Sequence, residues 1–101
     1  MIIRVMGEGQ WTIDVEALTN LNEVDERLER AVEAGDEAAV RELLQELFTR
    51  LQELGSPVPD DVLAESDVVL PDPTASLEDV KLVLEATREY YDGLLPDEVQ
   101  E

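Results

Sequence analysis

Two helix-forming stretches joined by a very short connection constrain this chain more than any other feature. Apolar residues recur every three or four positions over 15–34 and again over 37–54, which places them on one face of each helix. The first set is Val15, Leu18, Leu21, Val24, Leu28 and Val32, and the second is Val40, Leu43, Leu44, Leu47, Phe48, Leu51 and Leu54. Gly35 can adopt the left-handed conformation that ends a helix, and the Asp36 side chain can cap the next one. Because so short a connection forces antiparallel neighbours, we expect a helical hairpin around which the rest of the chain packs.

The residues before the first helix predict a β-hairpin over 2–13. Residues 2–6 are mostly apolar and rich in β-branched side chains, residues 10–13 alternate in polarity, and Gly7-Glu8-Gly9 lies between them. In this pattern Trp11 shares a face with Ile13. A two-stranded hairpin alone is marginal in water, so its apolar face must lie on the helices or on a third strand.

Residues 55–76 form the least regular part of the chain, because four prolines rule out a continuous helix there. Gly55 is expected to stop the second helix, and a short helical turn is expected within 58–63. Val68–Leu70 is typical of a short strand ended by Pro71, and it is the candidate for a third strand beside the hairpin.

A third helix is expected over 77–92, with Ser76 as its cap and Asp79 in the position that completes a capping box. Tyr90 and Tyr91 point in two directions around this helix, so one ring is expected to be exposed. Leu94 and Leu95 follow, before an acidic tail over 97–101. Two interpretations of these leucines stay open: they fold back onto the core, or they form an exposed apolar contact for a partner.

Acidic residues dominate the face of the first helix that is expected to point outward. This face carries Glu16, Glu23, Asp25, Glu26, Glu29 and Glu33, with Arg27 and Arg30 among them. The spacing predicts two ion pairs four residues apart, Glu23 with Arg27 and Glu26 with Arg30. Taken together, the pattern predicts one α+β, mostly helical domain over 1–101: a β-hairpin packed on an antiparallel helical hairpin plus a C-terminal helix.

The net charge of −19, from 26 acidic and 7 basic residues, restricts the partners of this chain. It argues against nucleic acid and against direct docking on an anionic membrane. Lys81 is the single lysine. A carboxylate-rich surface almost free of lysine suits a cytoplasm full of salt, where repulsion is screened, so we expect a halophilic source. An ordinary acidic protein and an acidic mimic of nucleic acid remain the alternatives.

The residues that usually carry catalysis are largely missing. The chain contains no histidine and no cysteine, so the common nucleophile and base pairs cannot be assembled and we expect no enzyme and no cofactor. The acids within 60–72 lack the spacing of a calcium loop, so a solvated loop is favoured over a metal site. No apolar run approaches the ~20 residues of a spanning helix, and we expect a cytoplasmic location without direct membrane insertion.

Seven segments, in order along nearly the whole chain, resemble the PspA-associated protein family. They are residues 2–11, 20–25, 31–37, 55–61, 65–71, 76–80 and 93–96. Two differences accompany the resemblance: Trp11 stands where a tyrosine is expected, and the helix over 77–92 is longer than is typical of the family.

The resemblance implies a small, mostly helical protein that binds or regulates PspA, the coiled-coil protein of the envelope-stress (phage-shock) response. PspA belongs to the membrane-remodelling superfamily that includes ESCRT-III. No catalytic residues come with this resemblance. We therefore expect a non-enzymatic adaptor that contacts PspA through helices, with Trp11, Tyr90, Leu94 and Leu95 as the candidate contact residues. The alternative function is an acidic nucleic-acid mimic, or another interaction module, that binds a basic partner.

Overall fold

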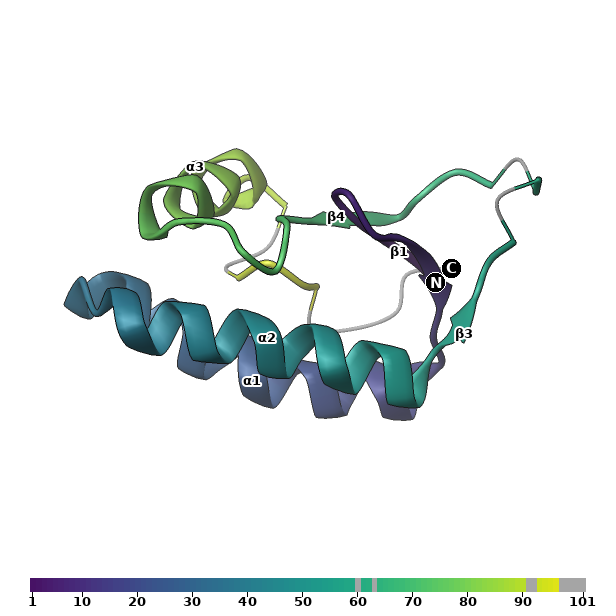
Figure 1. Cartoon of the computed structure of the whole chain (residues 1–101), viewed down its shortest axis with the longest axis horizontal. Coiled ribbons are helices and arrows are strands. Elements are labelled where there is room, and N and C mark those ends of the chain that lie inside the picture. The colour runs from purple at the N-terminus through teal and green to yellow at the C-terminus, as the bar shows by residue number, and fades with distance from the viewer. Residues whose placement is uncertain (60, 63, 91–92, 97–101) are drawn as a thin grey trace.

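Helices α1 (Val15–Ala34) and α2 (Glu37–Leu54) lie side by side and antiparallel in the computed structural model, which describes residues 1–59, 61–62, 64–90 and 93–96 (Figure 1). Gly35 ends α1 in the left-handed conformation, with φ 71°. Asp14 caps α1 by accepting the Ala17 N–H, and Asp36 caps α2 in the same way. These caps satisfy donors that a helix N-terminus leaves without intrahelical partners. The expected helical hairpin is confirmed.

The four strands form one mixed sheet in the order β3-β2-β1-β4. Strands β1 (Ile2–Val5) and β2 (Gly9–Thr12) make the predicted hairpin, and β4 (Val68–Leu70) pairs with β1 in parallel as the predicted third strand. Strand β3 (Ser56–Pro57), which pairs with β2, was not predicted. The stretch 55–76 is therefore less irregular than expected, because both edges of the sheet come from it.

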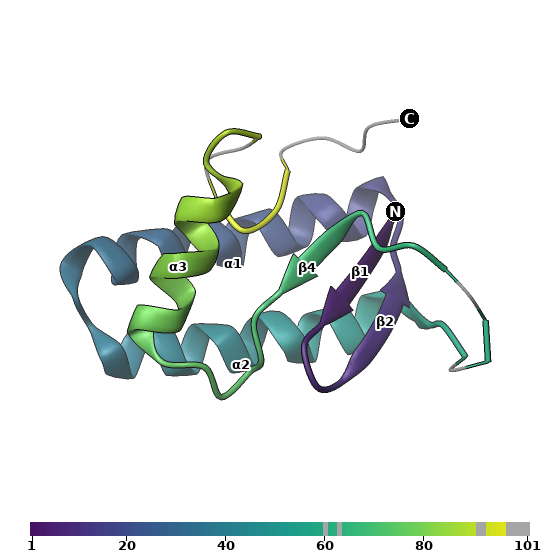
Figure 2. The same cartoon turned by 90° about the horizontal axis from the view of Figure 1, so that it is seen from above.

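The sheet and α3 (Leu77–Thr87) lie together in one layer above the helical hairpin (Figures 1 and 2). Alternate strand residues point inward, and they meet the apolar faces of α1 and α2. The inward strand residues are Ile3, Val5, Trp11, Val68 and Leu70, all buried. The Trp11 ring packs edge-on against Phe48, with 5.4 Å between the ring centroids. One core therefore joins both layers.

Helix α3 is shorter than predicted. The capping box of Ser76 and Asp79 begins it as expected, but it ends at Thr87 rather than at residue 92. The Thr87 hydroxyl contacts the backbone oxygens of Leu84 and Gly93, at 3.2 and 3.0 Å. Leu94 and Leu95, which follow Gly93, are buried in the core. Tyr91, expected on the inner face of the helix, lies outside the described residues.

The ion pairs on the helices follow the prediction in part. Arg30 approaches Glu26 at 4.0 Å, as expected, but Arg27 pairs with Glu46 on α2 at 2.5 Å. Arg50 also contacts Glu46, at 3.3 Å. A carboxylate on the neighbouring helix thus displaces the local partner of Arg27. No helix among the described residues is long and apolar enough to cross a membrane.

Candidate interaction surface

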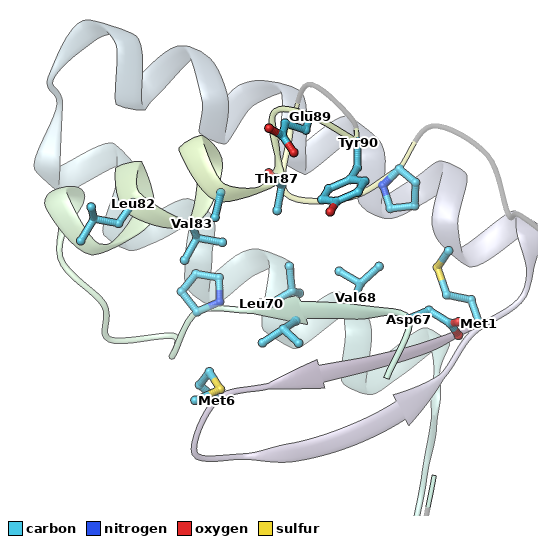
Figure 3. Close-up of a pocket in the computed structure, with 14 residues that line it drawn as sticks. Met1, Met6, Asp67, Val68, Leu70, Leu82, Val83, Thr87, Glu89 and Tyr90 are labelled. Carbon is cyan, nitrogen blue, oxygen red and sulfur yellow. The ribbon is translucent and has the colours of Figure 1, made fainter. Parts of the chain in front are cut away.

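A groove of about 900 Å³ separates α3 from β4, the strand at the edge of the sheet (Figure 3). One wall carries Leu82, Thr87 and Tyr90, and the other carries Met6, Leu70 and Asp67 (Figure 3). The lining is mostly apolar. Its charged side chains are two carboxylates, Asp67 and Glu89. The groove therefore combines an apolar surface with negative charge.

The exposed apolar side chains of the described chain gather at this groove. Seven large apolar residues are exposed, namely Met6, Val15, Leu54, Val62, Val69, Leu82 and Tyr90. Four of them line the groove: Met6, Val69, Leu82 and Tyr90, with exposed fractions of 52, 46, 64 and 77%. Exposed apolar residues scattered singly need no explanation, but a cluster beside a groove marks an interaction site.

A buried carboxylate holds the segment that contributes Pro96 to the lining of the groove. Asp25 is only 3% exposed, and its two oxygens accept the backbone N–H groups of Leu94 and Leu95, each at 3.0 Å. Asn22, one turn earlier on α1, donates to the Pro96 carbonyl at 3.0 Å. Residues 93–96 are thereby fixed against α1, and Pro96 lines the groove. The expectation that Asp25 points outward is wrong, because its carboxylate caps this returning segment.

The position of β4 is set by side-chain hydrogen bonds to the residues that precede it. Asp67 accepts the Ile2 N–H at 2.8 Å, next to the start of the ladder between β1 and β4. The Gln10 amide on β2 donates to the Ala64 carbonyl at 3.1 Å and to the Ser66 hydroxyl at 2.7 Å. These hydrogen bonds hold residues 64–67, which lead into β4, against β1 and β2. They therefore fix the position of the strand that forms one wall of the groove.

The acidic residues near the groove are not arranged as a metal centre within the described chain. No group of three or more acidic side chains there could hold a metal ion. Asp72 accepts hydrogen bonds from the Thr74 hydroxyl and backbone N–H, which lower the pKa of its carboxyl below the usual 3.8. Asp60, one of the acids considered in the sequence, lies outside the described residues. The local role of Asp72 is to shape a turn.

A protein-family model, described as PspA-Associated protein, matches residues 1–97. The chain belongs to the PspA-associated protein family. Neither the curated proteins nor the solved structures gave a match. Family membership links this chain to PspA, and the family is not a known enzyme family.

Among the residues predicted to contact a partner, only Tyr90 lies on the groove. Trp11 is 8% exposed and belongs to the core, so its side chain is not presented at the surface as a contact residue would be. Leu94 and Leu95 are fully buried, which decides between the two interpretations in favour of folding back onto the core. All three side chains belong to the buried core rather than to the groove lining.

Sequence reasoning missed Met6, Val69 and Leu82, although two of them carry a recognisable pattern. Val69 sits at the outward position of a strand whose neighbours on both sides point inward. Leu82 lies off the α3 stripe that buries Val80 and Leu84. Large apolar residues on faces that should be polar are the sequence signature of such a surface.

Proposed function

We propose that this protein is a non-enzymatic adaptor that binds the coiled-coil protein PspA through the groove between α3 and β4. Membership in the PspA-associated family supports the choice of partner. The observation that carries the choice of surface is the clustering of exposed apolar side chains at the groove. Burying such a cluster against a partner is the main favourable contribution that this surface can offer.

The charge of the chain supports a protein partner over the alternatives. A net charge of −19 opposes binding to nucleic acid and to anionic lipid headgroups. The protein would then reach a membrane only through PspA, from the cytoplasm. In that role it regulates the envelope-stress response by occupying PspA, and it needs neither a cofactor nor a catalytic group.

The test is to measure the affinity of purified PspA from the same organism for the wild type and for two double variants. Leu82→Ser with Tyr90→Ser removes apolar surface from the groove. Val15→Ser with Leu54→Ser removes two exposed apolar residues outside the groove lining, with exposed fractions of 62 and 45%. Because apolar anchors at an interface contribute about 1–2 kcal/mol or more each, we expect the groove variant to bind at least ~30-fold more weakly.

The control variant should bind PspA within about twofold of the wild type. Thermal melts of both variants verify that they are folded, since substitutions at exposed positions rarely change stability by more than ~0.5 kcal/mol. A wild type that does not bind PspA overturns the proposed function. Equal losses in the two variants would refute the groove as the contact surface.

A further inference from the structure

The even-numbered residues of β1 direct their backbone groups toward β4. The Ile2 carbonyl accepts the Asp67 N–H at 2.8 Å, and the Met6 N–H donates to the Leu70 carbonyl at 3.1 Å. Alternate residues of a strand face the same neighbour. Arg4, midway between Ile2 and Met6, therefore also directs its N–H and C=O at β4.

This alternation leaves the backbone of Val69 facing the open side of β4. Val69 stands opposite Arg4 in the parallel register. In a parallel ladder a residue bonds to the two neighbours of its opposite number, so Arg4 pairs with Val68 and Leu70 while the Val69 N–H and C=O point away. Among the described residues no strand lies on that side, because β4 ends the order of the sheet. The groove thus contains a backbone donor and acceptor beside its apolar side chains.

We infer that the groove receives an extended segment of the partner, which pairs with Val69 and adds a fifth strand to the sheet. This inference rests on the proposed function and specifies how PspA is bound. In strand addition, main-chain hydrogen bonds contribute affinity, and the side chains on alternate positions contribute specificity. Alternate side chains of an added strand point to the inner face of the sheet, as Val68 and Leu70 do on β4, so they meet apolar surface there. The groove wall with Leu82, Val83 and Tyr90 then lies along the far edge of the added strand. The segment therefore carries apolar residues at every second position.

The negative charge of the groove predicts which residues lie next to the apolar positions of that segment. Asp67 and Glu89 are the charged side chains of the lining, so lysine or arginine beside the apolar residues is attracted to the groove. A second copy of this chain is a poor occupant, because each copy has a net charge of −19. The occupant is therefore an apolar, extended segment with basic flanks from outside the helical core of the coiled coil.

A helix laid in the groove is the competing arrangement, and the backbone chemistry disfavours it. The backbone groups of a helix are already bonded within the helix, so they cannot pair with the N–H and C=O of Val69. Covering these two groups without a partner costs free energy, whereas an extended segment satisfies both. The groove also follows the direction of β4, as an added strand would (Figure 3).

The first test is backbone amide hydrogen exchange, measured by NMR on the free protein and on its complex with PspA. The Val69 amide should exchange rapidly in the free protein and at least tenfold more slowly in the complex. The Arg4 amide, already paired with β4, should be protected in both states. A complex in which Val69 exchanges as fast as in the free protein overturns strand addition.

The second test separates the backbone of Val69 from its side chain. Val69→Pro removes the N–H, which an edge strand tolerates where that N–H faces solvent, and Val69→Ala removes most of the side chain but keeps the N–H. Strand addition predicts that Val69→Pro binds PspA at least tenfold more weakly than Val69→Ala. Val62→Ala, at a residue with a similar exposed fraction outside the groove lining, should bind like the wild type.

The outcomes distinguish this inference from the proposed function. A wild type that does not bind PspA overturns both. Binding that is weakened equally by Val69→Pro and Val69→Ala overturns strand addition alone, and it supports a helix in the groove. Thermal melts verify that the Val69→Pro variant is folded, and if it is not, the exchange measurement on the wild type decides.

Discussion

Gly93 packs directly on the carboxylate of Asp25: a Cβ atom added at Gly93 would lie 2.9 Å from the Asp25 Cγ. The requirement for glycine at this position is steric, since no side chain fits between the loop and α1. This close approach lets the next two residues, Leu94 and Leu95, donate their N–H groups to the same carboxylate. Asp25 and Gly93 together set the return of the chain that brings Pro96 to the groove.

Gly93→Ala should lower the free energy of unfolding by about 1–3 kcal/mol, because the new methyl group displaces the Asp25 carboxylate or the loop. Chemical denaturation measures this loss. Asp25→Ala alone should cost about 2–5 kcal/mol, since it leaves buried N–H groups without an acceptor. Asp25→Ala also makes room for the methyl group of Gly93→Ala. The variant that carries both substitutions should therefore lose less free energy of unfolding than the sum of the two single losses. Losses in the free energy of unfolding that are strictly additive in the double variant would contradict the contact between Gly93 and Asp25.

Leu94→Ala should destabilise the protein by about 2–5 kcal/mol, because this side chain is fully buried in the shared core. Leu82→Ala, at a residue 64% exposed, should change the stability by no more than ~0.5 kcal/mol. Denaturation curves of the two variants provide the comparison. If Leu94→Ala unfolds at the same denaturant concentration as the wild type, the packing of the C-terminal segment described above is wrong.

Elements fixed by local patterns could be predicted from the sequence. The spacing of apolar residues and the connection at Gly35-Asp36 define the helical hairpin, and the Ser76 capping box defines the start of α3. Strand β3 has no such pattern, because its two residues become a strand only by pairing with Trp11 and Thr12. The end of α3 at Thr87 has no such pattern either, and the Thr87 hydroxyl there donates to the Gly93 carbonyl beyond the helix.

The candidate surface was harder to predict than the fold, for two physical reasons. Asp25 was assigned to the outward face because acids are rarely buried, although it continues the stripe of Leu18, Leu21 and Leu28 on the same helix. Trp11 is a predicted contact residue, although its alternation with Ile13 places it on the apolar face of the β-hairpin. The groove also takes lining residues from the start of the chain, Met1 and Met6, and no local pattern places these beside β4 and α3.

Asp72 should titrate below its usual range, because Thr74 donates two hydrogen bonds to the charged carboxylate and lowers its pKa. Since the pKa is lower in the folded state than in the unfolded state, the stabilisation is present above about pH 3.8 and is lost as the pH falls through the lowered pKa. Thr74→Val should raise the pKa of Asp72 toward the usual value in an NMR titration. Thr19→Val, which removes a hydroxyl bonded to a backbone carbonyl, should leave the Asp72 titration unchanged.

The excess of acids should make the stability of this protein depend strongly on salt. With 26 acidic and 7 basic residues, most carboxylates have no cation to pair with, and Arg27 and Arg50 even share one partner, Glu46. KCl screens the remaining repulsion, and the Debye length falls from ~10 Å at 0.1 M to ~3 Å at 1 M. We expect the melting temperature to rise by about 10 °C over this range. This rise corresponds to a gain of roughly 1–3 kcal/mol in the free energy of unfolding, since ~1 kcal/mol shifts the melting temperature of a chain of this size by ~4–8 °C.

A charge-reduced variant separates screening from a general salt effect on burial. Replacing the exposed Glu23, Glu33 and Glu42 by glutamine removes three negative charges from the helical hairpin. This variant should melt higher than the wild type at 0.1 M KCl and gain less on going to 1 M, because less repulsion remains to be screened. Parallel salt curves for the two proteins would assign the effect to salt-strengthened apolar burial instead. A melting temperature that does not change with KCl would refute the inference that this surface is adapted to a salt-rich cytoplasm.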